Sequence, residues 1–232
     1  MNKNKLHKIT AVLFALLFWQ TAAMILDRSF LLSSPIEVLK ALLELGFSSV
    51  FWTGMWKSVC KILLGFLTGA GMGIFLAGLS YRFKLFEIYI SPYIMVIRSI
   101  PVASFVIIIL IWLGGGGLSL FVCFFMVMPI FYANTLEGLK SVDVKMLHMA
   151  KIFEMSNNAK LIYIYLPALE SFLLSASVAS IGIAFKSGIA AEVIGRPKDT
   201  LGFFLFDAKM YLDTSKVFAI TLTVIILSLI HI

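Results

Sequence analysis

Two basic side chains, Arg98 and Lys186, lie within otherwise apolar stretches of the sequence. A charged side chain at the centre of a membrane costs roughly 2.5–3.5 kcal/mol on insertion scales, so it normally faces protein or water. Either cation could attract an anion along a polar pathway. The competing interpretation is structural. Either side chain could extend to the membrane surface, and Lys186 could pair with Glu192, six residues later. The residues alone leave both interpretations open.

The other reactive residue types show no arrangement typical of catalysis or metal binding. His7, His148 and His231 lie at loops or chain ends, and His148 has no second ligand at i+3 or i+4. Cys60 and Cys123 lie inside apolar segments, where cysteine behaves as a small hydrophobe. The sequence contains no nucleophile-elbow, zinc-protease or phosphate-loop pattern. We therefore expect no enzyme and no cofactor bound by this chain.

The composition is that of a membrane protein. Hydrophobic residues make up 61% of the 232 residues and charged residues 13%, against about half and a quarter in soluble domains. The formal charge of +7 is better explained by basic cytoplasmic loops than by nucleic-acid binding. We predict an all-α integral membrane protein surrounded by membrane lipid, without a separate soluble domain.

Six transmembrane helices are predicted from the apolar runs. They cover residues 9–26, 57–80, 85–113, 118–136, 163–190 and the stretch from about 216 onward. We divide the chain into an N-terminal transmembrane helix (1–30), an outer interfacial segment (31–56) and a transmembrane core (57–232). Lysines before the first span favour a cytoplasmic N-terminus. A cleaved signal peptide is the alternative, but the run is long for one. The last span stops without a basic tail, so the residues leave open whether the C-terminus is truncated.

Glycine and proline mark special positions inside these spans. Gly65, Gly69 and Gly73 fall four residues apart on one helix face, a spacing that allows two helices to pack closely in lipid. Pro92 and Pro101 are expected to break the third span, because proline frees backbone groups that protein or water must satisfy. The residues expected to line a pathway are Arg98, Pro101, Lys186 and Glu192.

A polar connection between the fourth and fifth spans, residues 137–170, has helical order. Asp143 is suited to an N-cap position, and residues after it repeat at i, i+3, i+4 and i+7. The apolar positions are Met146, Met149, Ala150 and Phe153, and the polar positions are Lys145, His148 and Lys151. Such an amphipathic cytoplasmic helix could lie on lipid, pack on its own bundle, or dock into a partner's groove.

The connection resembles the EAA loop of binding-protein-dependent ABC importer permeases. That pattern is roughly Glu-Ala-Ala, three residues, Gly, and about nine residues to a hydrophobic residue followed by Leu-Pro. In this chain the triplet is His148-Met149-Ala150, the Gly position holds Glu154, and the closing element is Tyr165-Leu166-Pro167. The family's Glu and Gly are replaced. We expect the turn to form from residues 155–158 instead, because asparagine tolerates the left-handed conformation.

Further motifs resemble the nitrate/sulfonate/taurine branch of that family, and the likeness covers about residues 31–230. In chain order they are Leu32-Ser33-Ser34-Pro35 with Glu37-Val38; Arg98-Ser99-Ile100-Pro101; Asn134-Thr135 with Gly138-Leu139 and Ser141-Val142-Asp143; Ala190-Ala191-Glu192-Val193-Ile194-Gly195; and Leu201-Gly202. Each motif alone is weak, but five in the same order are specific.

The resemblance implies a type I ABC importer permease fold, with a cytoplasmic coupling helix between the fourth and fifth spans, in a bacterial cytoplasmic membrane. A solute-binding protein outside the cytoplasm would deliver a small anion such as a sulfonate, taurine or nitrate. Two permease subunits, as a homodimer, would form the pathway, and an ATPase dimer would bind ATP and Mg. The implied ATPase contacts are Met146, His148, Met149, Ala150, Lys151, Phe153, Glu154, Ser156, Leu166 and Pro167. The alternative is a stand-alone secondary transporter or channel, which usually shows internal repeats; we find none.

Overall fold

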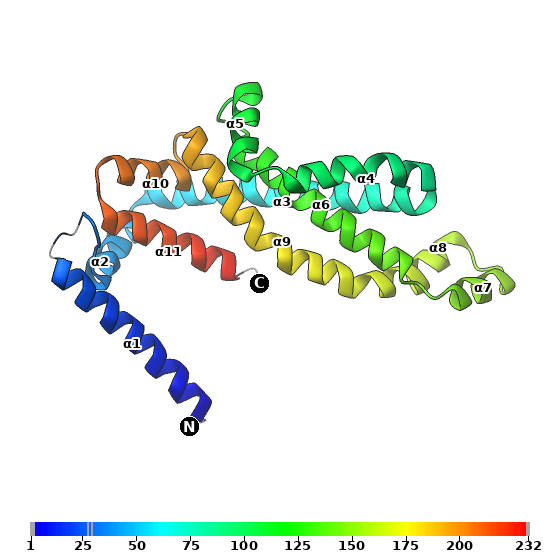
Figure 1. The fold of residues 1–232 in the computed structure, drawn as a ribbon, viewed down its shortest axis with the longest axis horizontal. Coiled ribbons are helices and arrows are strands. Elements are labelled where there is room, and N and C mark those ends of the chain that lie inside the picture. The colour runs from blue at the N-terminus through cyan, green and yellow to red at the C-terminus, as the bar shows by residue number, and fades with distance from the viewer. Residues whose placement is uncertain (1–2, 27, 29, 231–232) are drawn as a thin grey trace. The chain divides into compact units, whose positions relative to one another are not determined.

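The computed structural model describes the chain except for residues 1–2, 27, 29 and 231–232, so His231 lies outside the described residues (Figure 1). The described part consists of helices and the turns that join them, with no β-strand in it. The predicted all-α class is confirmed.

Three continuous helical segments are long and apolar enough to cross a membrane: α3 (Ser49–Arg82), α6 (Leu118–Lys140) and the segment Asn157–Gly195. The last contains α8 (Asn157–Lys160), a π-helical turn η1 (Leu161–Tyr165) and α9 (Leu166–Gly195).

A fourth crossing results if α4 (Lys84–Ser99) and α5 (Val102–Leu113) form one span, bent by 104° between them. Shorter apolar stretches occupy Thr10–Leu26 in α1 (Lys3–Leu26) and Thr214–Leu229 in α11 (Thr214–Ile230). Three to four spans therefore meet the length criterion in the described part of the chain, and the count of six stays a prediction.

The chain divides into two compact units, residues 1–57 with 196–227 and residues 58–195 with 228–232. In the first unit, α2 (Pro35–Gly46) begins with a capping box. Ser34 Oγ accepts from the Glu37 amide at 3.3 Å, and a Glu37 carboxylate oxygen accepts from the Ser34 amide at 2.8 Å. This reciprocal pair satisfies two amides that the first helical turn leaves free, so the helix begins where its sequence predicts.

Residues 191–213 lie between the fifth and sixth predicted spans, where we expect an outer loop, but they are more ordered than a loop. Helix α9 continues to Gly195, and α10 occupies Leu201–Met210. Between α10 and α11, Asp213 accepts hydrogen bonds from Ser215 and Lys216. Burial raises the pKa of the Asp213 carboxyl, but these hydrogen bonds outweigh burial and hold it below its ordinary value. The loop prediction is wrong in extent because capped, apolar short helices satisfy the backbone here.

In the second unit, the glycine stripe of α3 packs directly on the backbone of α6. A Cβ at Gly69 would lie 2.7 Å from the Phe124 carbonyl oxygen, and one at Gly73 would lie 2.5 Å from that of Met128. A Cβ at Gly65 would meet the Leu120 carbonyl oxygen still more closely. The predicted close approach is confirmed. Helices α6 and α9 also pack on each other, side by side (Figure 1).

The third predicted span breaks at one proline, not two. Pro92 lies inside α4 without ending it, whereas Pro101 follows Ile100, which is extended at ψ 128°. A proline disfavours the helical conformation in the residue before it. The chain therefore turns at Ile100 and begins a new helix, α5, after Pro101, whereas α4 continues through Pro92.

Candidate functional site

The polar connection folds as the predicted helix, α7 (Val144–Ile152). Asp143 is its N-cap, and the carboxylate Oδ1 accepts from the Lys145 amide at 2.8 Å. α7 starts three residues after α6 ends at Lys140, so it is held close to the end of a membrane-spanning helix.

Ala150 fixes α7 to the rest of its unit. It is fully buried in a cluster with Val142 and Ile164, and partly buried side chains including Leu147 and Tyr165 pack around them. A small side chain is required there because α7 lies directly on the start of the helical segment that leads into α9. The predicted coupling residue Ala150 is thus the internal anchor of α7.

Three apolar side chains of α7 and one directly after it are exposed. We call Met146, Met149, Ile152 and Phe153 the α7 patch; 44% of Met146, 47% of Met149, 79% of Ile152 and 73% of Phe153 is exposed. Lys145, His148 and Lys151 are exposed beside it. The predicted apolar stripe is therefore divided: Ala150 packs inward, and the other three positions are left without cover in the described residues.

Glu154 occupies the position where the resembling family has glycine, and its backbone has φ 46°. The Glu154 amide donates to the Lys151 carbonyl at 3.1 Å, and the Met155 amide donates to that of Ala150 at 2.9 Å. These are the two bonds of a Schellman motif, whose C′ residue is left-handed. The prediction that Asn157 or Asn158 supplies this conformation is wrong; both lie in α8.

Replacing Glu154 by glycine should stabilise this turn. A left-handed conformation costs a residue with a Cβ about 1–2 kcal/mol, and part of the gain is offset by the flexibility of glycine in the open state. We expect a net gain of about 1 kcal/mol, or about fivefold slower hydrogen exchange at the Met155 amide. The matched control is Asn158→Gly, which should speed exchange within α8. Unchanged or faster exchange at the Met155 amide in Glu154→Gly would contradict the inference that the Glu154 backbone is strained.

The remaining coupling candidates connect α7 to the membrane-spanning helix. Ser156 caps α8, with its Oγ accepting from the Ala159 amide at 3.2 Å. Leu166, 48% exposed, and Pro167, also exposed, open α9 directly after the π-helical turn. Ser156 therefore acts here as a helix cap, and the coupling role of these residues stays a prediction.

The pathway candidates do not form one cluster. Glu192 is fully buried and accepts a hydrogen bond from Ser58 Oγ at 2.7 Å. Lys186 is exposed, and the described residues include no ion pair between it and Glu192. Pro101 lies at the break between α4 and α5. Pairing with Glu192 therefore does not explain why Lys186 lies in an apolar stretch. Glu192 instead contributes to the contact between α3 and α9.

Arg98 lines a cavity of about 630 Å³ between α4 and α6. The α4 residues around it are Ser91, Ile94, Met95, Arg98 and Ser99, and the α6 residues are Tyr132, Ala133, Leu136, Glu137 and Lys140. The cavity therefore combines apolar walls with three hydroxyl groups and three charged side chains.

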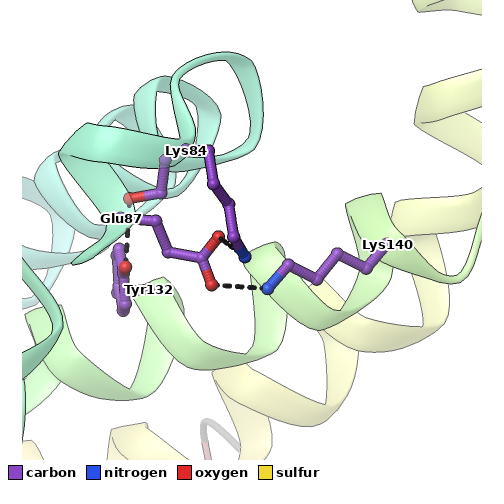
Figure 2. A network of polar contacts seen from close by, with 5 residues as sticks. Lys84, Glu87, Tyr132 and Lys140 are labelled. Atoms are coloured by element: carbon purple, nitrogen blue, oxygen red, sulfur yellow. Dashed lines mark hydrogen bonds and ion pairs between the residues drawn. The ribbon is translucent and has the colours of Figure 1, made fainter.

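Sequence reasoning missed a polar network that includes Lys140 and Tyr132, two residues that line this cavity (Figure 2). The Glu87 carboxylate receives the Lys140 ammonium at 2.6 Å and the Lys84 ammonium at 3.0 Å. Nearby, the hydroxyls of Ser80 and Tyr132 lie 3.0 Å apart in a buried hydrogen bond. The i, i+3 spacing of Lys84 and Glu87 was a usable signal, but the link to Lys140 required the tertiary fold.

Comparison with known proteins supplies an independent line of support. A model of the family described as binding-protein-dependent transport system inner membrane component matches residues 69–231. The aliphatic sulfonates transport permease protein SsuC, so named in Bacillus subtilis, is 28% identical over 190 residues, 81% of this chain and 68% of that protein.

Two other relatives carry different names. The formylaminopyrimidine transport permease protein ThiX of Halalkalibacterium halodurans is 24% identical over 89% of this chain and 82% of its own length. The nitrate import permease protein NrtB of Synechococcus elongatus is 23% identical over 65% of this chain and 54% of its own length.

Proposed function

The chain belongs to the family of binding-protein-dependent transport system inner membrane components, and on that premise we propose that α7 docks into the ATPase that drives it. The protein is the membrane-spanning permease subunit of an ABC importer, a transport protein and not an enzyme. Family membership favours this function over a stand-alone secondary transporter or channel.

The observation that carries the docking proposal is the α7 patch. Exposed apolar side chains grouped on one short helix mark a protein interaction site, and a helix laid into a groove is a common recognition mode. Because Ala150 is fully buried, α7 is held against its own unit. A partner that binds the patch therefore moves α6 and α9 together with α7.

The charged residues beside the patch suit a protein partner. Lys145, His148 and Lys151 are exposed on α7, and the exposed Glu154 follows at its end. Charges at the rim of an apolar contact fix orientation and partner choice more than affinity. Glu154 and His148 stand where the resembling family has Gly and Glu, so we propose that they adapt the contact to this chain's own ATPase.

The assembly we propose contains two copies of this permease, an ATPase dimer that binds ATP and Mg, and a solute-binding protein outside the cytoplasm. Each permease crosses the bacterial cytoplasmic membrane six times, with the N-terminus in the cytoplasm. The support is the set of apolar helices, the family match and the small size of a single subunit, which favours a dimeric pathway.

The proposed solute is a small anion such as a sulfonate, taurine or nitrate. The names of the relatives SsuC and NrtB support this class, and the exposed cations Arg98 and Lys186 suit an anionic cargo. The relative ThiX is named for a formylaminopyrimidine, so the family accommodates other solutes.

Cysteine labelling tests where α7 lies and what covers it. In an Ile152→Cys variant, a membrane-impermeant maleimide should react in inside-out vesicles and not in intact spheroplasts. Reconstitution with the ATPase subunits should slow the reaction at least tenfold, because Ile152 is 79% exposed in the free chain and would become buried in the groove.

The matched control is Phe83→Cys, in the turn between α3 and α4. Phe83 is 54% exposed and belongs to the same predicted cytoplasmic side, but lies outside the α7 patch. It should label equally with and without the ATPase. Labelling of Ile152→Cys from outside the cell, or labelling that the ATPase leaves unchanged, would overturn the docking proposal.

A further inference from the structure

We propose that the cavity between α4 and α6 binds the oxyanion group of the transported solute, with Arg98 as its cationic ligand. This inference rests on the proposed function, because it assigns a binding site within the transport pathway. The ligand class is a small solute with a sulfonate, nitrate or related oxyanion group.

Arg98 is the unpaired cation of this cavity. Its guanidinium makes no hydrogen bond or ion pair within the described residues, whereas the other lining cation, Lys140, is paired with Glu87 at 2.6 Å. An ionisable group on a membrane-spanning helix is costly unless protein, water or a ligand compensates its charge. A guanidinium is suited to oxyanions because its planar N–H groups can donate two parallel hydrogen bonds.

The lining carboxylate, Glu137, lies toward the other end of the cavity. The Glu87–Lys140 pair joins the start of α4 to the end of α6, so the two helices run antiparallel there. Arg98 is 11 residues beyond Glu87, about 16 Å along α4. Glu137 is three residues before Lys140, about 5 Å along α6. The negative charges therefore lie at one end and Arg98 toward the other.

The cavity has the size and lining of a small-molecule site. Its volume of about 630 Å³ falls within the range of about 300–1,000 Å³ for ligand pockets. Ser91, Ser99 and Tyr132 line it together with Ile94, Met95 and Leu136.

A phosphate group from an anionic lipid has the same oxyanion chemistry, but the position of Arg98 along α4 argues against a lipid as the ligand. Arg98 follows Lys84 by 14 residues, about 21 Å along α4, and the Lys84–Glu87–Lys140 network marks a charged membrane boundary at the other end. The hydrocarbon core is about 30 Å thick, so an α4 that runs along the membrane normal would leave Arg98 about 9 Å short of the far headgroups. The solute is therefore the occupant that we assign.

Charge-selective thiol labelling tests the site without knowledge of the natural solute. Met95, which lines the cavity, is replaced by cysteine in a Cys60→Ser/Cys123→Ser background, and the complex with its ATPase is placed in phosphatidylcholine nanodiscs. The probes are the anionic sulfonatoethyl and the cationic trimethylammonioethyl methanethiosulfonates. Arg98→Gln should lower the anionic-to-cationic rate ratio about tenfold, whereas Arg98→Lys should largely retain it.

Tyr93→Cys is the matched control: it lies on the same helix, is 68% exposed and does not line the cavity. Its rate ratio should not respond to Arg98→Gln. Millimolar methanesulfonate should slow anionic labelling at Met95→Cys several-fold, and only when Arg98 is present.

Three results would overturn the inference. One is an unchanged ratio at Met95→Cys in Arg98→Gln. The second is a lack of protection by methanesulfonate and by nitrate. The third is protection that appears only in phosphatidylglycerol nanodiscs, which would assign the site to lipid. None of these three results would change the labelling of Ile152→Cys, which tests docking of α7. Failure of the anion site is therefore distinguishable from failure of the docking proposal.

Discussion

Replacement of both Met149 and Phe153 by glutamate is expected to release the ATPase from the permease. Both side chains belong to the α7 patch, and docking would bury them in an apolar groove. Burial of an unpaired charge costs at least about 2 kcal/mol, so two charges should weaken the complex by about a thousandfold. The ATPase should no longer co-purify, and ATP-driven uptake should fall to the level of membranes without the transporter.

The control for this double variant is Phe83→Glu, which adds a carboxylate to another exposed aromatic position of the same predicted cytoplasmic side. It should retain the ATPase and transport. Because Met149 is about half exposed and Phe153 mostly exposed, the double variant should largely keep the melting temperature of the permease alone. Co-purification at wild-type yield from Met149→Glu/Phe153→Glu would refute the docking site.

Gly69→Leu is expected to push α3 away from α6 and to lower the thermal stability of the second unit. Even a Cβ at this position would lie 2.7 Å from the Phe124 carbonyl oxygen, an atom of the backbone that cannot rotate away. Overpacking by a few methylene groups costs typically about 1–3 kcal/mol, and a rigid backbone contact places this variant at or above the upper end. The purified protein should melt at least 10 °C lower and should transport poorly.

Gly71→Leu is a matched control on the same helix. A Cβ at Gly71 meets nothing within 4 Å, so a leucine there can extend into lipid. Its melting temperature, followed by fluorescence-detected size exclusion after heating, should stay close to that of the unaltered protein. Equal destabilisation by both substitutions would contradict the close-packing explanation, because leucine is the better helix former at either position.

The features that could be predicted from sequence are those encoded by local spacing. The glycine stripe of α3 and the N-cap at Asp143 each depend on residues within a few positions of one another, and each is confirmed. The order of the coupling segment was predictable for the same reason: its helix begins after a cap and ends where the family resemblance places a turn.

Features that depend on tertiary contacts were not predictable. The apolar stripe of α7 gave no sign that Ala150 would be buried while Phe153 stayed exposed, because the side covered by the chain itself is decided by Ile164 and Val142. The ion pair between Lys140 and Glu87 joins residues 53 positions apart. The left-handed Glu154 was missed because asparagine is the better intrinsic candidate, yet the Schellman hydrogen bonds fix the strained position immediately after α7.

The helical segment that follows the Ser156 cap runs without interruption from Asn157 to Gly195, 39 residues, or about 58 Å at the α-helical rise. A rod of that length amplifies small rotations: tilting it by about 5° about its Asn157 end displaces the Gly195 end by about 5 Å, roughly one helical turn. Under the docking proposal, a modest swing imposed at α7 would therefore become a much larger movement at Gly195.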